Sequence, residues 1–404
     1  MNQARMKQKD NETNQLPSFD PAKLFDLRER SKIPNGHSIY IQAGDTSDFD
    51  GYLIAAAGEV LQLRTKQLDF VIAVPERRVW LDKNETDLTK HDQVHSEEVL
   101  ATGGAILRHL CPRACLVRGP LNQRNVIPWK MMFNEPERYG PLLKGFKTVD
   151  VRWTALKTLA ERILSPQVSS VILDMNGSVG YLDSLVKILQ HDGEQVLGHK
   201  LRASGRPVVV MAGVQAEVAP QTLPLPGRDP RSTSNAIYHP DGVRVLLRLA
   251  KKYSVPLLFV TNNICNQLLK FQDAGEVLEQ LLGLREGEGD LLRRISDTWF
   301  GMPHLKGKCV PFDWVAFAAM LLYDRAPTTM RVVQQELWVG RNDPSVLVLR
   351  DTSNQQQNDV VTKNLEGTEL YGVVSSVSYV DHAEMLALAK YAVATHSKTT
   401  SVSK

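Results

Sequence analysis

An α/β fold is indicated by one stretch of the chain, Ile39-Tyr-Ile-Gln-Ala-Gly-Asp-Thr-Ser-Asp-Phe-Asp-Gly-Tyr-Leu-Ile-Ala55. Its first residues are apolar and partly β-branched, which is typical of a buried strand. They lead into a short turn that carries Asp45, Asp48 and Asp50, and helical periodicity follows over residues 51–65. In a strand, turn and helix of this kind, the acidic side chains lie at the carboxyl end of the strand, where α/β proteins bind their ligands.

The same alternation of strand and helix continues along the chain. The predicted strands are 38–42, 70–74, 170–173, 207–211, 255–260 and 345–349, with a last one at 372–380, and the predicted helices are 51–65, 153–164, 241–253, 277–282 and 314–323. Near-continuous apolar strands alternating with helices indicate a doubly wound α/β fold, with a mostly parallel central sheet and helices on both faces.

This pattern predicts one large domain, residues 17–395. Residues 1–16 and 396–404 are polar and are expected to be mobile tails. The polar segment 351–363 is predicted to be an insertion that forms a hairpin tip, and the proline-rich segment 215–234 a long loop at the carboxyl end of a strand.

Composition excludes several classes of protein. The chain has 404 residues and a formal net charge of +3, so nothing electrostatic favours nucleic acid or a membrane surface as a partner. No apolar run approaches the roughly 18 to 20 residues that span a bilayer, and residues 1–15 contain no signal-peptide region, so the cytoplasm is the predicted location. The four cysteines are too scattered for a disulfide scaffold and are predicted to be free thiols. Phosphate-binding glycine motifs are absent, which disfavours a nucleotide switch.

The acidic turn predicts a metal site. Carboxylate oxygens are the hard ligands that Ca²⁺ or Mg²⁺ requires, and Asp45, Asp48 and Asp50 are close together in sequence. The structural alternative is that Asp50 serves as an ordinary helix N-cap.

Further blocks resemble a known family. The stretch Ser234-Asn-Ala-Ile-Tyr-His-Pro-Asp-Gly-Val-Arg244 is similar to E-F-N-x-x-x-D-P-E-A-A-R, and Val255-Pro-Leu-Leu-Phe-Val-Thr261 follows it as V-P-x-x-x-V-T-H would. The stretch Val310-Pro-Phe-Asp-Trp-Val-Ala-Phe-Ala318 resembles H-D-P-x-A-V-A, and the acidic turn resembles D-x-D-x-x-x-D-D. In this order and spacing, over about residues 37–325, the blocks resemble the inosine-uridine preferring nucleoside hydrolase family.

The resemblance implies a Ca²⁺-dependent hydrolase of N-ribosidic bonds. Asp45, Asp50 and Asp313 match the carboxylates that hold Ca²⁺, and Asp45 also matches the general base. Met175 falls where a backbone carbonyl completes the metal shell, and Asn235 matches a ribose-binding Asn. A helix-capping Asp313 and a turn-forming Asn235 are the structural alternatives. The resemblance also implies a nucleoside or other ribosyl ligand, purine and pyrimidine salvage, and a dimer or tetramer.

Four positions depart from the family pattern. Ala43 and Phe49 replace two acids of the turn, Thr233 replaces a ribose-binding Glu, and Phe312 replaces a His that assists the leaving base. Thr233, Phe49 and Phe312 remain candidate substrate contacts with Asn235, and the two rings would either stack on a base or pack in the core. The departures favour a second hypothesis, a catalytically inactive homologue that serves as an interaction or structural module. The retained metal carboxylates favour a hydrolase with altered sugar recognition.

Overall fold

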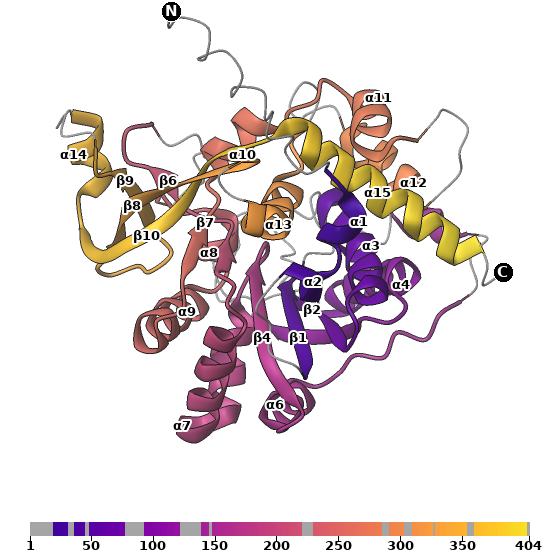
Figure 1. Cartoon of the computed structure of the whole chain (residues 1–404), viewed down its shortest axis with the longest axis horizontal. Helices are drawn as coiled ribbons and strands as arrows, with labels where there is room; N and C mark the ends of the chain where they lie inside the picture. The colour runs from indigo at the N-terminus through magenta and orange to yellow at the C-terminus, as the bar shows by residue number, and fades with distance from the viewer. Residues whose placement is uncertain are drawn as a thin grey trace, which may run out of the picture.

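The computed structural model describes most of the chain (Figure 1). The described residues are 19–30, 36–44, 48–76, 93–121, 139–144, 148–219, 229–284, 291–302, 309–325, 328–353 and 359–401. The predicted N-terminal tail, residues 1–16, and Asp45 lie outside them.

A central sheet organises this part of the molecule, with ten strands in the order β3-β2-β1-β4-β5-β7-β10-β8-β9-β6. The strands are β1 His37–Ala43, β2 Leu68–Glu76, β3 Cys115–Leu121, β4 Val168–Met175, β5 Val208–Val210, β6 Val214–Gln215, β7 Leu257–Phe259, β8 Met330–Gly340, β9 Leu347–Asp351 and β10 Thr368–Val380. The block from β3 to β7 is parallel, and β10 joins β7 in parallel. Antiparallel pairing begins only at β10 with β8 and continues to β9. The mostly parallel sheet is therefore confirmed.

Helices cover both faces of this sheet. They are α1 Pro21–Leu24, α2 Leu27–Arg30, α3 Phe49–Arg64, α4 Gln93–Leu110, α6 Leu156–Leu164, α7 Gly180–Ala203, α8 Ser234–Ile237, α9 Pro240–Tyr253, α10 Asn262–Leu268, α11 Ala274–Glu276, α12 Leu291–Phe300, α13 Phe312–Leu322, α14 Asp359–Leu365 and α15 His382–Ser401, with the short helical turns η1 Gly140–Leu143, η2 Val277–Leu282 and η4 Tyr323–Arg325. Because successive strand residues point to opposite faces, Tyr40 joins the core beneath α3 and α13, whereas Ile39 and Ile41 join the core beneath α7 and α9. This two-sided burial confirms the doubly wound fold.

Two predicted boundaries differ from the structure. The segment 351–363 was expected to form a hairpin tip, but its end belongs to α14, which begins at Asp359 and buries Val361. The C-terminal tail was expected from residue 396, but α15 continues to Ser401, and His396 is buried. The reason is packing, because α15 crosses α1 and α3 and its apolar side lies in the core against α3 (Figure 1).

Two smaller predictions can be compared directly. All four cysteines are free thiols, as predicted. Among the described helices, none combines the length and apolar character that a membrane span requires.

The hydroxyl of Thr65 joins the N-terminal helices to α3. Its Oγ1 accepts a hydrogen bond from the Leu27 N–H at 3.0 Å and donates one to the Phe25 carbonyl at 2.9 Å. Thr65→Val is expected to lower the free energy of unfolding by about 2 kcal/mol, because it removes both hydrogen bonds of a buried hydroxyl. Urea unfolding measures this loss. Thr328→Val is the matched control, since that hydroxyl is exposed and donates to the Arg325 carbonyl. An equal loss in both variants would mean that the buried hydrogen bonds of Thr65 add no stability.

Candidate functional site

Three carboxylates converge where β1 gives way to α3. Asp48 is the N-cap residue of α3, Asp50 lies in the first turn of α3, and Asp313 lies in the first turn of α13. Oxygen atoms from all three lie within 4.8 Å of one another. The Asp313 N–H donates to Asp50 Oδ2 at 2.8 Å, which fixes the two helix starts against each other. The chain thus brings together residues more than 260 positions apart.

The site is both buried and negative. Asp50 is 5% exposed and Asp313 is 6% exposed. Burial, and then the negative charges of Asp313 and Asp50, raise the pKa of the neighbouring Cys265 thiol. Three carboxylates this close could hold a metal ion between them, because a shared cation would offset their mutual repulsion. A set of oxygen ligands from carboxylates suits Ca²⁺ or Mg²⁺.

The predicted metal ligands are partly brought together. Asp50 and Asp313 share the cluster, and neither is an N-cap, because α3 is capped at Asp48 and α13 at Pro311. Asp48 joins them in the cluster, although the family resemblance matches it to no metal ligand. Its place beside Asp50, one residue before the helix, was the signal for it.

Met175 lies at the end of β4, and its carbonyl accepts a hydrogen bond from the Met211 N–H at 3.0 Å. This bond continues the pairing of β4 with β5, so one acceptor position of the predicted metal-binding carbonyl is already in use. Two residues later, Gly177 packs against the end of β1. A Cβ there would lie 2.7 Å from the carbonyl oxygen of Ala43 and 2.9 Å from that of Gly44.

The predicted ribose contacts lie at the same edge of the sheet. The amide of Asn235 donates to the carbonyl of Asn176 at 2.6 Å and to that of Met211 at 3.1 Å, so it ties the ends of β4 and β5 together. Thr233 is buried and its carbonyl accepts from the N–H groups of Ala236 and Ile237. Among the described residues, its Oγ1 has no hydrogen-bond partner.

The two phenylalanines are placed differently. Phe49 is fully buried in the core, with its ring edge-on to Phe300 at 5.2 Å between centroids. Phe312 is half-buried, packs on the same core and adjoins Asp313. Of the two rings, only that of Phe312 is partly accessible.

Asp174, a buried acid that the sequence pattern does not single out, lies on β4 near the carboxyl edge of the sheet. Asp174 is fully buried on β4, and its Oδ2 accepts from the Tyr40 hydroxyl at 2.7 Å and from the Asn176 amide at 3.0 Å. Burial raises the pKa of Asp174 to about 7, against the opposing effect of these two hydrogen bonds. The only signal was an acid inside an apolar strand.

Gly177→Ala is expected to weaken metal binding about tenfold. The added Cβ meets backbone rather than a movable side chain, so the ends of β1 and β4 must separate next to the acidic turn. Calorimetric titration with Ca²⁺ measures the change. Gly140→Ala is the control, since a Cβ there has nothing within 4 Å. Unchanged affinity in Gly177→Ala would mean that this close approach does not shape the site.

Comparison with known proteins identifies the fold. No family model matches the sequence, and no curated protein does. Among solved structures, the inosine-uridine preferring nucleoside hydrolase from Bacillus anthracis superposes with a TM-score of 0.55 at 13% identity, covering 88% of this chain and 99% of that one. A plant nucleoside hydrolase, PpNRh1, gives 0.53 at 12%, covering 89% and 99%. The effector protein XOO4466 gives 0.50 at 14%, covering 92% and 98%. This likeness shows a nucleoside hydrolase-like α/β fold.

Proposed function

We propose that the protein is a Ca²⁺-dependent hydrolase of N-ribosidic bonds that converts a nucleoside, or a related ribosyl compound, and water into ribose and free base. The observation that carries the proposal is the convergence of Asp48, Asp50 and Asp313 at the carboxyl edge of a nucleoside hydrolase-like sheet. The proposal extends to a dimer or tetramer that acts in cytoplasmic purine and pyrimidine salvage, with a small ribosyl ligand and neither nucleic acid nor a membrane as its partner.

The donor set fits a hard divalent cation. Asp48, Asp50 and Asp313 would hold Ca²⁺, together with Asp45 of the same turn. When bound, Ca²⁺ would lower the pKa of a water and orient it and the ribose hydroxyls. The carboxylate of Asp45 would accept a proton from the attacking water, whose oxygen bonds to the anomeric carbon as the bond from that carbon to the base nitrogen breaks. The base would leave with the bonding electron pair and take up a proton from solvent.

The chain's own residues account for altered sugar recognition. Phe49 is packed into the core where an acid would otherwise face a sugar. The Thr233 hydroxyl offers a neutral hydrogen-bonding group, and Asn235 holds the neighbouring strand ends. Phe312, next to Asp313, is proposed to stack on the leaving base.

The test combines two readouts on protein stripped with a chelator. Ca²⁺ is titrated by calorimetry, and ribose release from a panel of purine and pyrimidine nucleosides is followed with a reducing-sugar assay. We expect Ca²⁺ binding with ribose release, and loss of release in Asp45→Asn. Full activity in Asp45→Asn would remove the assigned base. Ca²⁺ binding with no release from any nucleoside would exclude nucleosides as the substrate and point to a different ribosyl compound or a structural metal.

A second candidate is an inactive nucleoside hydrolase-like protein that serves as an interaction or structural module. The burial of Phe49 favours it, because that side chain cannot reach a sugar without leaving the core. Absence of both Ca²⁺ binding and ribose release would make this candidate the better account.

A further inference from the structure

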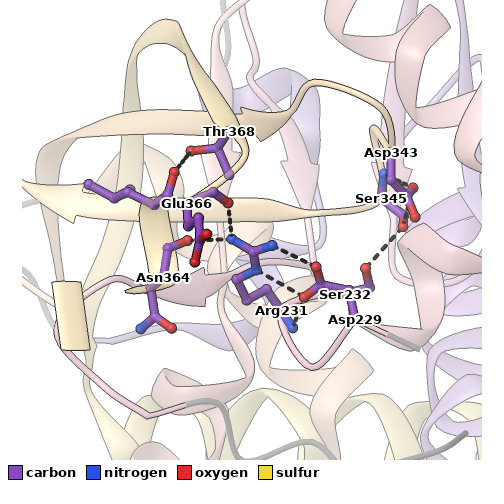
Figure 2. A network of polar contacts seen from close by, with 9 residues as sticks. Asp229, Arg231, Ser232, Asp343, Ser345, Asn364, Glu366 and Thr368 are labelled. Carbon is purple, nitrogen blue, oxygen red and sulfur yellow. Dashed lines mark hydrogen bonds and ion pairs between the residues drawn. The ribbon is translucent and has the colours of Figure 1, made fainter. Parts of the chain in front are cut away.

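Two stretches of chain at the carboxyl edge are hydrogen-bonded to the same helix, α14, which lies between β9 and β10 in the sequence. One stretch is residues 214–219, which follows β5, and the other is residues 229–233, which leads directly into Asn235. Figure 2 shows the polar network that holds the second stretch against the end of α14 and the start of β10. This network lies outside the metal cluster.

Asn364 bonds both stretches at once. It is buried at the end of α14, and its side-chain amide donates to the carbonyl of Ala216 at 2.8 Å and to that of Val218 at 3.1 Å. Its backbone carbonyl accepts from Nη1 of Arg231 at 2.9 Å. A single residue therefore fixes the spacing between the two stretches.

Arg231 completes the fastening. The same Nη1 donates to the Glu366 carbonyl at 2.6 Å, while Nε and Nη2 donate to the two oxygens of Asp229 at 2.9 and 2.6 Å (Figure 2). These hydrogen bonds lower the pKa of Asp229 and raise that of Arg231. The planar guanidinium donates to the Asp229 carboxylate and to two carbonyls at the same time. A lysine ammonium cannot reproduce this arrangement of donors.

The next residue extends the network to β9. Ser232 Oγ lies 3.0 Å from Ser345 Oγ, whose hydroxyl donates to Asp343 at 2.6 Å. Ser232 also forms an antiparallel bridge with Val346. Thr233 follows at once, so its position and that of Asn235 are set from the C-terminal side of the sheet.

We propose that Arg231 and Asn364 are positioning residues that hold the Thr233 to Asn235 turn in place for a ribosyl substrate. The unit formed by β8, β9, α14 and β10 then supports the substrate site by holding this turn. This inference rests on the proposed function. In a site that lacks the acidic sugar contacts, the position of this turn would determine the affinity for the sugar.

The expected signature separates positioning from general damage. Asp50 and Asp313 lie on α3 and α13, away from the network, so Ca²⁺ affinity is expected to stay within about twofold. Arg231→Ala is expected to raise KM about 10- to 100-fold, with a smaller change in kcat, because a displaced turn loses sugar contacts. Arg231→Lys, which keeps the charge and most of the side chain, is expected to raise KM nearly as much.

The experiment measures KM and kcat for ribose release, Ca²⁺ affinity, and hydrogen exchange at the Ala236 and Ile237 amides, which both bond the Thr233 carbonyl. Faster exchange and a higher KM in both Arg231 variants are expected. Arg244→Ala is the control, since Arg244 pairs with Asp241 on the exposed side of α9. Wild-type KM and exchange in Arg231→Ala would overturn the proposal.

The exchange readout also separates the two proposals. If the wild-type protein binds Ca²⁺ but releases no ribose, nucleosides are excluded as its substrate. Faster exchange in the Arg231 variants alone would then establish the fastening but overturn its role toward substrate.

Discussion

Asp313→Asn is expected to lower Ca²⁺ affinity by at least about 100-fold and to reduce ribose release in the same proportion. Substitutions in the shell outside a metal already cost about 10- to 100-fold, and Asp313 is a member of the cluster itself. Asn has the same size and keeps the backbone N–H that donates to Asp50. The loss is therefore one negative charge within a buried site, with little change in packing.

The measurement is calorimetric titration of chelator-stripped protein, followed by the ribose assay at saturating Ca²⁺. Asp241→Asn is the matched control. Asp241 also lies in the first turn of a helix, but its side chain is 40% exposed and pairs with Arg244. Equal Ca²⁺ affinity in Asp313→Asn and the wild type would show that the three carboxylates are not the metal site.

The part of the molecule that carries this site could be predicted from local pattern. The apolar run before Asp45 pairs with β2 and β4 over almost its whole length, so its strand character is evident in the letters alone. The carboxyl end of such a strand is a general ligand site. Asp50 could therefore be placed without knowing its neighbours.

Strand β8 and helix α14 could not be predicted from local pattern, because contacts with distant parts of the chain stabilise them. Strand β8 has no apolar run in its sequence, because Gln334 lies on the outward side of the strand and the buried Gln335 is satisfied by Gln215 from a distant strand. Helix α14 arises from a polar segment because Val361 is buried and Asn364 bonds distant carbonyls. Neither reason is visible in the segment itself.

Asp174 shows the same limit at a single residue. The Tyr40 hydroxyl donates to Asp174, although Tyr40 on β1 is paired with Ile172 on β4. Asp174 lies two residues after Ile172, on the same face of the sheet. Gln42 is opposite Asp174 itself. Within the described structure, neither Gln42 Oε1 nor Asp174 Oδ1 has a hydrogen-bond partner. A proton on Asp174 would remove the buried charge and give its carboxyl a donor of its own.

Asp174→Asn is therefore expected to stabilise the protein at alkaline pH. The folded-state pKa of about 7 lies above the ordinary 3.8, so the unfolded chain releases this proton first. The contribution of the protonated carboxyl to stability is complete below about pH 4 and is lost as pH rises through 7. The rise from 3.8 to about 7 corresponds to about 4 kcal/mol in total.

Urea unfolding of both proteins at pH 5 and pH 8 tests this. The advantage of the variant over the wild type is expected to grow by about 3 kcal/mol between the two pH values, because Asn cannot ionise and its amide supplies the donor at every pH. Asp150→Asn reports the response of a surface carboxyl, since that side chain is 72% exposed. A constant difference between Asp174→Asn and the wild type would mean that Asp174 is already ionised at pH 5.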